Sequence, residues 1–143
     1  MAKKETNPSM APEEYREFLR QVDLESIVLD SCSVKTDRQN IGSNMKLDVR
    51  PKVTYVIEEE TSATISVSYE LLVTQTTRKE YSLKLECVYQ VALSSKLPMT
   101  DSFMEIYTRV NIQMNMWPYF REFVQNMLQR VGFPPLTLPL LKP

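Results

Sequence analysis

Residues 115–140, NMWPYFREFVQNMLQRVGFPPLTLPL, predict one long amphipathic helix that ends abruptly before an apolar tail. Apolar residues recur every three or four positions, which makes one broad stripe on the helix. Pro118 is expected in the first turn, where a missing N–H group has no intrahelical partner to lose. Gly132 is expected to end the helix in the left-handed conformation, and the prolines that follow prevent it from resuming. The stripe consists of Met116, Phe120, Phe123, Val124, Met127, Leu128 and Val131.

The residues on either side of this stripe leave its role open. Trp117, Tyr119 and Phe123 widen the apolar surface beyond what one contact needs. The aromatic group fits the core between helix and sheet, and it equally fits an interface with another chain, where aromatic residues are enriched. The tail FPPLTLPLLKP is too rich in proline for a helix, so we expect it to lie extended over the sheet or over a neighbouring subunit.

Three segments before the helix alternate strictly between apolar and polar residues, which is the strongest sequence signal for a β-strand. They span Met45–Ile57, Ala63–Val73 and Tyr81–Leu93. Short polar connections predict antiparallel pairing, and a single apolar face per strand predicts a sheet covered by helices on one side only. Pro51 cannot donate a ladder hydrogen bond, so its strand is expected at an edge of the sheet or with a bulge.

A fourth strand is expected over Leu24–Lys35, and its pattern is less regular. Ile27 and Leu29 fall on one face, while Val28 and Val34 fall on the other. A strand with apolar residues on both faces is central and covered twice, contains a bulge, or meets another subunit. All three explanations stay open from the sequence.

Two shorter helices are expected around the strands. Pro12–Val22 carries apolar residues at helical spacing, and it covers the domain's own core or docks on a partner chain. Thr100–Thr108 can form a helix in which Ser102 and Glu105 make a capping box. Val110–Met116 alternates between apolar and polar residues, which predicts an extended connection.

The order of these elements, with a helix, four antiparallel strands and then helices, predicts an α+β fold with the helices on one face of the sheet. We expect a single domain over residues 11–143 after a disordered tail at residues 1–10. With 43% hydrophobic and 24% charged residues, the composition is that of a globular domain. A net charge of −1 argues against a nucleic-acid-binding surface, which would be basic.

The composition also argues against common chemistry. The chain has no histidine and two glycines, so the commonest general base, the commonest metal ligand and a glycine-rich phosphate loop are missing. We therefore expect no enzyme, no metal and no cofactor. Cys32 and Cys87 lack metal or redox spacing, and free buried thiols are expected. No apolar run is long enough to span a membrane and no secretory signal is visible, so a cytoplasmic location is expected.

The C-terminal third resembles the SecB family of protein-export chaperones. The shared pattern is Trp-Pro-Tyr-x-Arg-Glu at residues 117–122, then Gly-Phe-Pro-Pro-Leu at residues 132–136 and an apolar tail that contains proline. The sequence departs from the family at Phe120, where a small residue is usual, and in the short loop 37–44, which lacks the usual aromatic residues. Family members continue into a further C-terminal helix and an acidic tail, whereas this chain is nearly neutral.

The resemblance implies a SecB-like α+β fold and a homotetramer built as a dimer of dimers. It also implies a chaperone that holds unfolded polypeptides in exposed apolar grooves without ATP. Protein export, with a translocase motor as partner, and protection of one dedicated client such as an antitoxin both stay open. The alternative is a scaffold that binds a small molecule or a lipid in a cavity between helix and sheet.

Apolar positions that look exposed are the candidates for contact with other chains. The expected client-binding residues are Ile41, Met45, Met114, Met116, Leu136, Leu138 and Leu140. The expected subunit-interface residues are Ile27, Val28, Val34, Tyr119, Phe123 and Met127.

Overall fold

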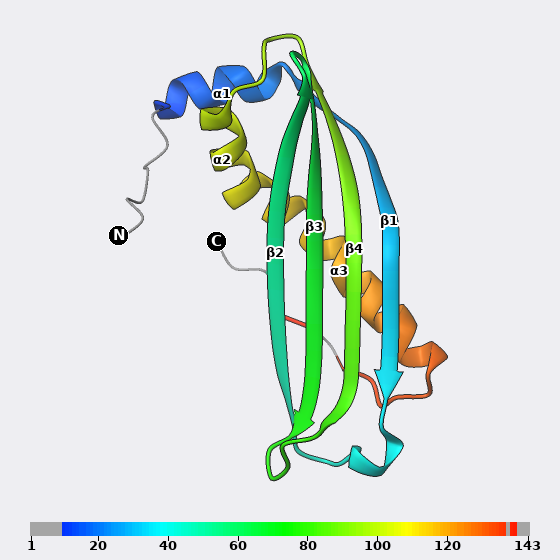
Figure 1. The fold of residues 1–143 in the computed structure, drawn as a ribbon. Coiled ribbons are helices and arrows are strands. Elements are labelled where there is room, and N and C mark those ends of the chain that lie inside the picture. Colours follow the sequence, from blue (N-terminus) through cyan, green and yellow to red (C-terminus); the bar gives the residue numbers. More distant parts are fainter. Residues whose placement is uncertain (1–9, 137, 140–143) are drawn as a thin grey trace, which may run out of the picture.

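The computed structural model describes residues 10–136, 138 and 139, and its largest element is a four-stranded antiparallel sheet in the order β1-β4-β3-β2 (Figure 1). The three regularly alternating strands are confirmed, and β2 lies at an edge of the sheet, as Pro51 predicts. The strands are β1 (Val22–Thr36), β2 (Met45–Glu59), β3 (Ser62–Gln75) and β4 (Tyr81–Ser95).

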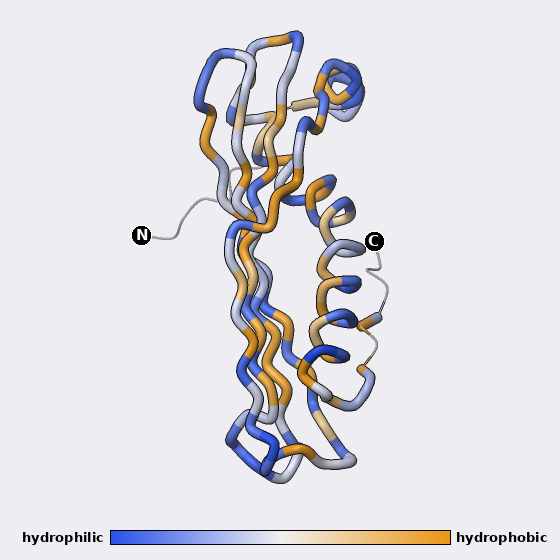
Figure 2. Tube along the Cα trace, turned by 90° about the vertical axis from the view of Figure 1, so that its right-hand side faces the viewer, coloured by the Kyte–Doolittle hydropathy of each residue, from blue (hydrophilic) through white to orange (hydrophobic). Residues whose placement is uncertain are grey.

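All three α-helices lie on one face of this sheet, which is called the inner face below (Figure 2). This arrangement confirms the predicted α+β fold. The helices are α1 (Pro12–Arg20), α2 (Asp101–Arg109) and α3 (Asn111–Arg130), and a short 3-10 helix, η1 (Arg38–Asn40), follows β1. The expected tail at residues 1–10 lies outside the described residues except for Met10, which packs half-buried against the core.

The core lies between the two central strands and the helices. On β3 and β4 the inner side chains alternate with polar ones and are almost completely buried, as with Ile65, Leu71, Leu85 and Val91. On β2 the inner side chains are only half-buried. The cover is therefore complete over the middle of the sheet and incomplete toward its edges.

Two bulges explain the irregular pattern of β1. Glu25 and Asp30 have no partner in the pairing with β4, because the register shifts by one residue at each of them. Each shift restores the alternation, so five apolar residues of β1 stand opposite inner apolar residues of β4 and face the same side. Of the three open explanations, the bulge is confirmed, and the expectation that apolar residues occupy both faces is wrong except for Val28. These inner residues of β1 are Leu24, Ile27, Leu29, Cys32 and Val34.

Helix α3 begins four residues earlier than expected. Val110–Met116 is helical rather than extended, apart from Val110 at the N-cap position. The earlier start makes Pro118 the eighth residue of the helix instead of a first-turn residue. Its missing N–H group leaves the carbonyl of Met114 without the usual intrahelical donor.

The C-terminal end of α3 follows the prediction. Gly132 has a φ of +67°, the left-handed conformation that glycine adopts without strain. The Phe133 N–H donates to the Leu128 carbonyl at 2.9 Å and the Gly132 N–H to the Gln129 carbonyl at 3.2 Å, which is the Schellman pattern. Arg38 of η1 donates to the Val131 carbonyl at 2.6 Å, so a cation also stabilises this negative end of the helix dipole.

The short helices pack on each other at one end of the sheet. Phe18 of α1 is buried and stacks on Phe103 of α2, with ring centroids 4.3 Å apart. Helix α1 therefore covers the domain's own core, one of its two open roles. The expected capping box is wrong: Thr100, not Ser102, is the N-cap of α2, and its hydroxyl accepts from the Phe103 N–H at 3.1 Å.

The loop after β1 is fixed to the turn between β3 and β4. The buried Asn40 accepts through its side chain from Arg78 at 2.8 Å and through its backbone carbonyl from Gln75 at 2.6 Å and from the hydroxyl of Ser82. Gly42 lies so close that a Cβ there would stand 2.7 Å from the Gln75 side chain. These contacts hold the lower end of the sheet together.

The left-handed end of α3 generates a stability prediction. Replacing Gly132 with alanine should lower the free energy of unfolding by about 1 kcal/mol, because an L-residue is strained at positive φ. A new Cβ would lie 3.8 Å from Arg38, which is ordinary contact, so strain rather than a clash sets the cost. Gly132→Asn is the matched control and should lose less, since asparagine tolerates this conformation. Urea denaturation measures both, and an alanine variant as stable as the wild type would contradict the prediction.

Candidate functional site

Helix α3 crosses the inner face diagonally, from the β2 side near α2 toward the far end of β1 (Figure 1). A diagonal helix leaves two corners of the sheet without helical cover. One corner lies along β1, and the other lies on the β2 side of the inner face, at the end of the sheet away from α2 (Figure 1). These two corners are the candidate functional surfaces.

The first corner is called the β1 margin and consists of the inner residues Leu24, Ile27, Leu29, Cys32 and Val34. Leu24 and Leu29 are 38% and 40% exposed, and Cys32 is exposed as well. The expectation that both cysteines are buried is therefore wrong for Cys32, which lies on an edge strand of the sheet. Ile27 and Val34 are half-buried, so the margin is an apolar strip that the described residues leave partly open to solvent.

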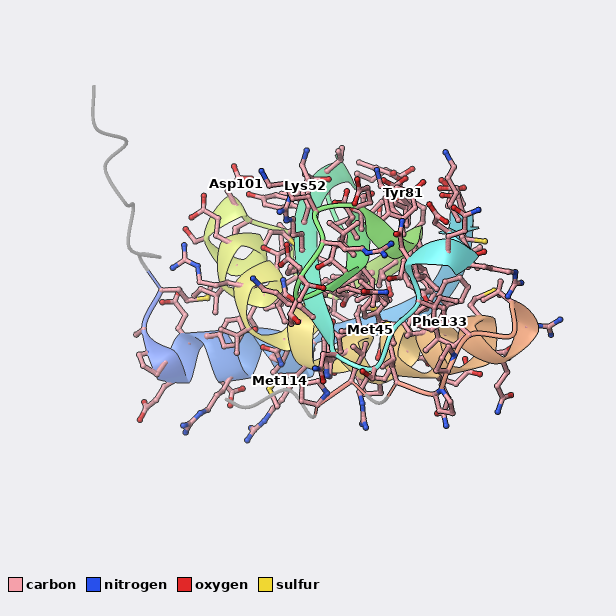
Figure 3. All side chains as sticks on the ribbon, turned by 90° about the horizontal axis from the view of Figure 1, so that it is seen from below. Met45, Lys52, Tyr81, Asp101, Met114 and Phe133 are labelled. Carbon is pink, nitrogen blue, oxygen red and sulfur yellow. The ribbon has the colours of Figure 1, made fainter. Side chains whose placement is uncertain are left out.

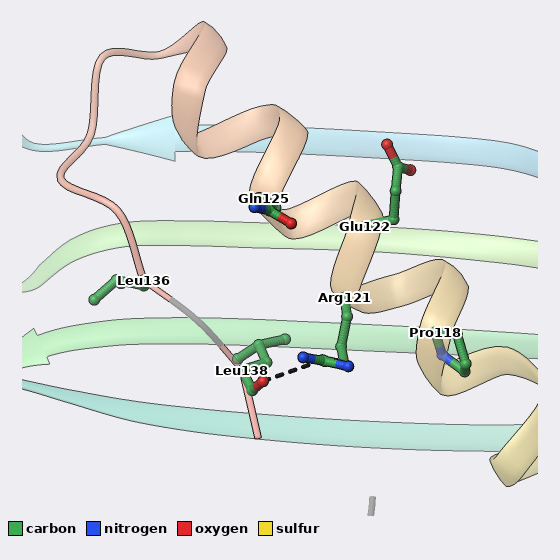
Figure 4. Close-up of a pocket in the computed structure, with 6 residues that line it drawn as sticks. All are labelled: Pro118, Arg121, Glu122, Gln125, Leu136 and Leu138. Atoms are coloured by element: carbon green, nitrogen blue, oxygen red, sulfur yellow. Dashed lines mark hydrogen bonds between the residues drawn. The ribbon is translucent and has the colours of Figure 1, made fainter. Parts of the chain in front are cut away.

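The second corner is closed by the residues that follow α3. Residues 133–136, 138 and 139, called the tail, run back across the inner face toward β2 (Figures 1 and 4). The indole Nε1–H of Trp117 donates to the Pro139 carbonyl at 2.8 Å, and the Arg121 Nε–H donates to the Leu138 carbonyl at 3.1 Å. The space between α3 and the β2 side of the sheet that the tail occupies is called the tail groove.

The tail fills this groove only in part. Leu138 is 4% exposed, and Leu136 is half-buried against the core. An open cavity of about 210 Å³ remains between the tail and α3, lined by Pro118, Arg121, Glu122, Gln125, Leu136 and Leu138 (Figure 4). A smaller cavity of about 80 Å³ lies next to it, beside Phe133 and Pro135.

The residues expected to bind clients differ in position and in exposure. Met114 is 54% exposed and lies on the helix side of the molecule, opposite Lys52 of the outer sheet face (Figure 3). Ile41 and Met45 are half-buried. Met116 is fully buried, so the expectation of an exposed side chain is wrong: it lies one turn before Phe120 on the stripe that faces the sheet.

The two described leucines of the tail differ in their exposure. Leu136 is partly accessible, whereas Leu138 is buried and not exposed as expected. Leu140 lies outside the described residues. The expectation that the tail lies extended over the sheet is confirmed for the described part, because it has no helix or strand and packs on the core.

The residues expected at a subunit interface are divided as well. Val28 and Tyr119 are 54% and 51% exposed. Ile27, Val34 and Met127 are half-buried, so part of each side chain is accessible. Phe123 is buried in the core of its own chain, which contradicts its expected exposure. Sequence reasoning missed Leu24 and Leu29 as exposed residues, because the irregular pattern suggests a bulge in β1 without fixing where the bulges lie.

Titratable groups under α3 are held in their neutral forms. Burial raises the pKa of the Cys87 thiol to about 12, and burial with the nearby Cys87 raises the pKa of Tyr69. The Tyr69 ring stacks on Phe120 with centroids 4.2 Å apart, and its hydroxyl has no hydrogen-bond partner among the described residues. Both groups pack as apolar side chains.

Two further features are absent from residues 10–136, 138 and 139. Histidine, cysteine and acidic side chains form no group of three or more that could hold a metal ion there. No helix in the same residues has the length and apolar character needed to cross a membrane.

Solved structures resemble this fold, although no family model and no curated protein matches the sequence. The Mycobacterium tuberculosis Rv1957 SecB-like chaperone, in complex with a ChAD peptide from the Rv1956 HigA1 antitoxin, aligns with a TM-score of 0.76. The alignment covers 88% of this chain and 95% of that one at 16% identity. A Streptococcus agalactiae protein of unknown function aligns with a TM-score of 0.47 at 9% identity, over 84% of this chain and 98% of its own. The alignment with the Mycobacterium tuberculosis structure confirms the predicted SecB-like fold.

The β1 margin generates a prediction about its cysteine. A thiol reagent at pH 8 should modify Cys32 in the folded protein and leave Cys87 unmodified, because Cys87 is buried and its pKa of about 12 leaves little thiolate at that pH. In denaturant both thiols should react. Mass spectrometry of proteolytic fragments identifies the modified residue. Comparable rates at the two cysteines in the folded protein would show that α3 does not cover the sheet as described.

Proposed function

We propose that this protein is an ATP-independent chaperone that holds unfolded or aggregation-prone polypeptides through its uncovered apolar surfaces. The observation that carries the proposal is that the apolar inner face extends beyond its helical cover at both edge strands. Exposed apolar patches on a folded domain mark sites where other chains bind. The exposed large residues include Leu24, Leu29, Met114 and Tyr119.

The fold adds support. The Mycobacterium tuberculosis protein with the same fold is described as a SecB-like chaperone and is bound to an antitoxin peptide. We therefore propose clients of the same kind: unfolded segments of exported proteins, with a translocase motor as possible further partner, or one dedicated antitoxin. A cytoplasmic homotetramer, built as a dimer of dimers, is part of the same proposal.

The proposed surfaces have different tasks. We assign client contact to Met114 and to the half-buried Ile41 and Met45, and subunit contact to the exposed side of β1 around Val28. The cavity beside α3 gives no support to a lipid-binding scaffold, because it is open and partly lined by Arg121 and Glu122. Lipid pockets are predominantly apolar and enclosed.

The proposal predicts suppression of aggregation without nucleotide. When a chemically unfolded test protein is diluted into buffer, near-stoichiometric amounts of this chain should reduce light scattering. Met114→Asp should raise the concentration needed for half-maximal suppression about fivefold, since disrupting one anchoring apolar contact costs about 1 kcal/mol or more. Val56→Asp is the matched control, because Val56 is 62% exposed on the outer face. Scattering unchanged by the wild-type chain would sink the proposal of a general holdase.

The subunit assignment predicts a change in mass. Val28 and Val56 are exposed valines on the outer faces of the two edge strands, so they form a matched pair. Val28→Asp should shift sedimentation toward smaller species, because a buried unpaired charge is costly in an interface. Val56→Asp should sediment like the wild type. A Val28→Asp protein with unchanged mass across a concentration series would remove β1 from the interface.

A further inference from the structure

The tail lies in its groove in the way that a bound peptide does. Trp117 and Arg121 each donate a side-chain hydrogen bond to a backbone carbonyl of the tail, Trp117 to that of Pro139 and Arg121 to that of Leu138. The two donors stand four residues apart on α3, so they share one flank of the helix. A backbone carbonyl is present in every residue, and these donors can therefore hold an extended chain regardless of its sequence.

Side-chain contacts supply the apolar part of the recognition. Leu136 and Leu138 are two positions apart, which places them on the same side of an extended chain. Leu138 is buried, and Leu136 is half-buried against the core. The groove therefore accepts apolar side chains at alternate positions.

The attachment of the tail is slight. Beyond Phe133, its described residues make no backbone–backbone hydrogen bond with the sheet or with α3. Pro134, Pro135 and Pro139 have no N–H group with which to add to a strand. Beyond Phe133, the tail is thus held by two side-chain donors and by the burial of its leucines, and this part can leave without breaking a ladder.

The groove also has room for a larger occupant. About 210 Å³ stays open beside Leu136 and Leu138, and Pro118, Arg121, Glu122 and Gln125 line the rest of this open cavity. A segment with an aromatic side chain at one of the two positions would fill more of this space than leucine does.

We propose that the tail groove is the binding site for an extended, uncharged client segment with apolar side chains at alternate positions, and that the tail is its built-in competitor. The inference rests on the proposed chaperone function and deepens it by naming the site and its resting occupant. In this view Leu136 and Leu138 do not contact clients. They occupy the place of a client, and the client takes over the hydrogen bonds that Trp117 and Arg121 donate to the Pro139 and Leu138 carbonyls.

The test uses a fluorescent synthetic peptide, FPPLTLPLLKP, with the sequence of residues 133–143. Its binding is measured by fluorescence anisotropy to the full-length wild type, Leu138→Asp and the conservative Leu138→Met. Leu138→Asp should bind the peptide at least about tenfold more tightly, because a tail docked about 90% of the time hides the groove for that fraction. Leu138→Met keeps the apolar contact and should bind like the wild type.

The single tryptophan reports on the tail directly. Trp117 is the only tryptophan of the chain, and its indole contacts Pro139. Its emission should shift to the red in Leu138→Asp and shift back when the peptide saturates the groove. Unchanged peptide affinity in a Leu138→Asp protein whose Trp117 emission shows a released tail overturns the inference. Peptide binding that leaves Trp117 emission unaltered overturns it as well, because the peptide then binds elsewhere.

Two measures keep this test decisive. If circular dichroism shows that Leu138→Asp is unfolded, Leu136→Asp makes the same test at a half-exposed position. The aggregation assay separates the two proposals. If the aspartate variant binds the peptide more tightly but the wild type suppresses no aggregation, the groove proposal is supported and the chaperone proposal is rejected. Suppression by the wild type without any gain in peptide binding supports the chaperone and rejects the groove.

Discussion

The inner face of the sheet is apolar and must be covered, and it is larger than one helix can cover. Strands of 15 residues are about 50 Å long, and four of them about 4.8 Å apart add a width of roughly 15–20 Å. The 20 residues of α3 span about 30 Å at a diameter of about 10 Å. Helices α1 and α2 cover one end and the tail covers another corner, but the described residues leave the β1 margin open.

These covers differ widely in strength. Helix α3 buries six apolar side chains, each contributing about 1.5–3 kcal/mol. Beyond the buried Phe133, the tail contributes mainly Leu138 and two hydrogen bonds of about 0.5–1.5 kcal/mol each, against an ordering cost of about 1–2 kcal/mol per residue. Its prolines lower that cost because they restrict the unfolded chain. A segment balanced in this way opens far below the free energy of global unfolding, as binding elements commonly do.

Much of the fold could be predicted from the sequence, because period-two alternation and the Gly132 stop are local signals. The start of α3 could not, since Val110–Met116 also alternates, and the helical spacing of Ile112, Met116 and Phe120 competes with that pattern. The same error led to the prediction that the Met116 side chain is exposed. The exposure of Leu138 was predicted wrongly because its burial depends on contact with α3, whose Arg121 lies 17 positions earlier in the sequence. The positions of the bulges in β1 depend on its pairing with β4. Side-chain exposure at the candidate site therefore required the tertiary structure.

The two bulges also decide what kind of surface the β1 margin is. They bring Leu24, Ile27, Leu29, Cys32 and Val34 to the inner face. They also place in this edge strand two acidic residues, Glu25 and Asp30, that have no partner in the ladder with β4. Bulges and charges at an edge hinder the addition of another strand in register. The margin thus favours contact through apolar side chains over extension of the sheet. Under the proposed function this distinction matters, because an open flat edge would template the strand pairing that a chaperone must prevent.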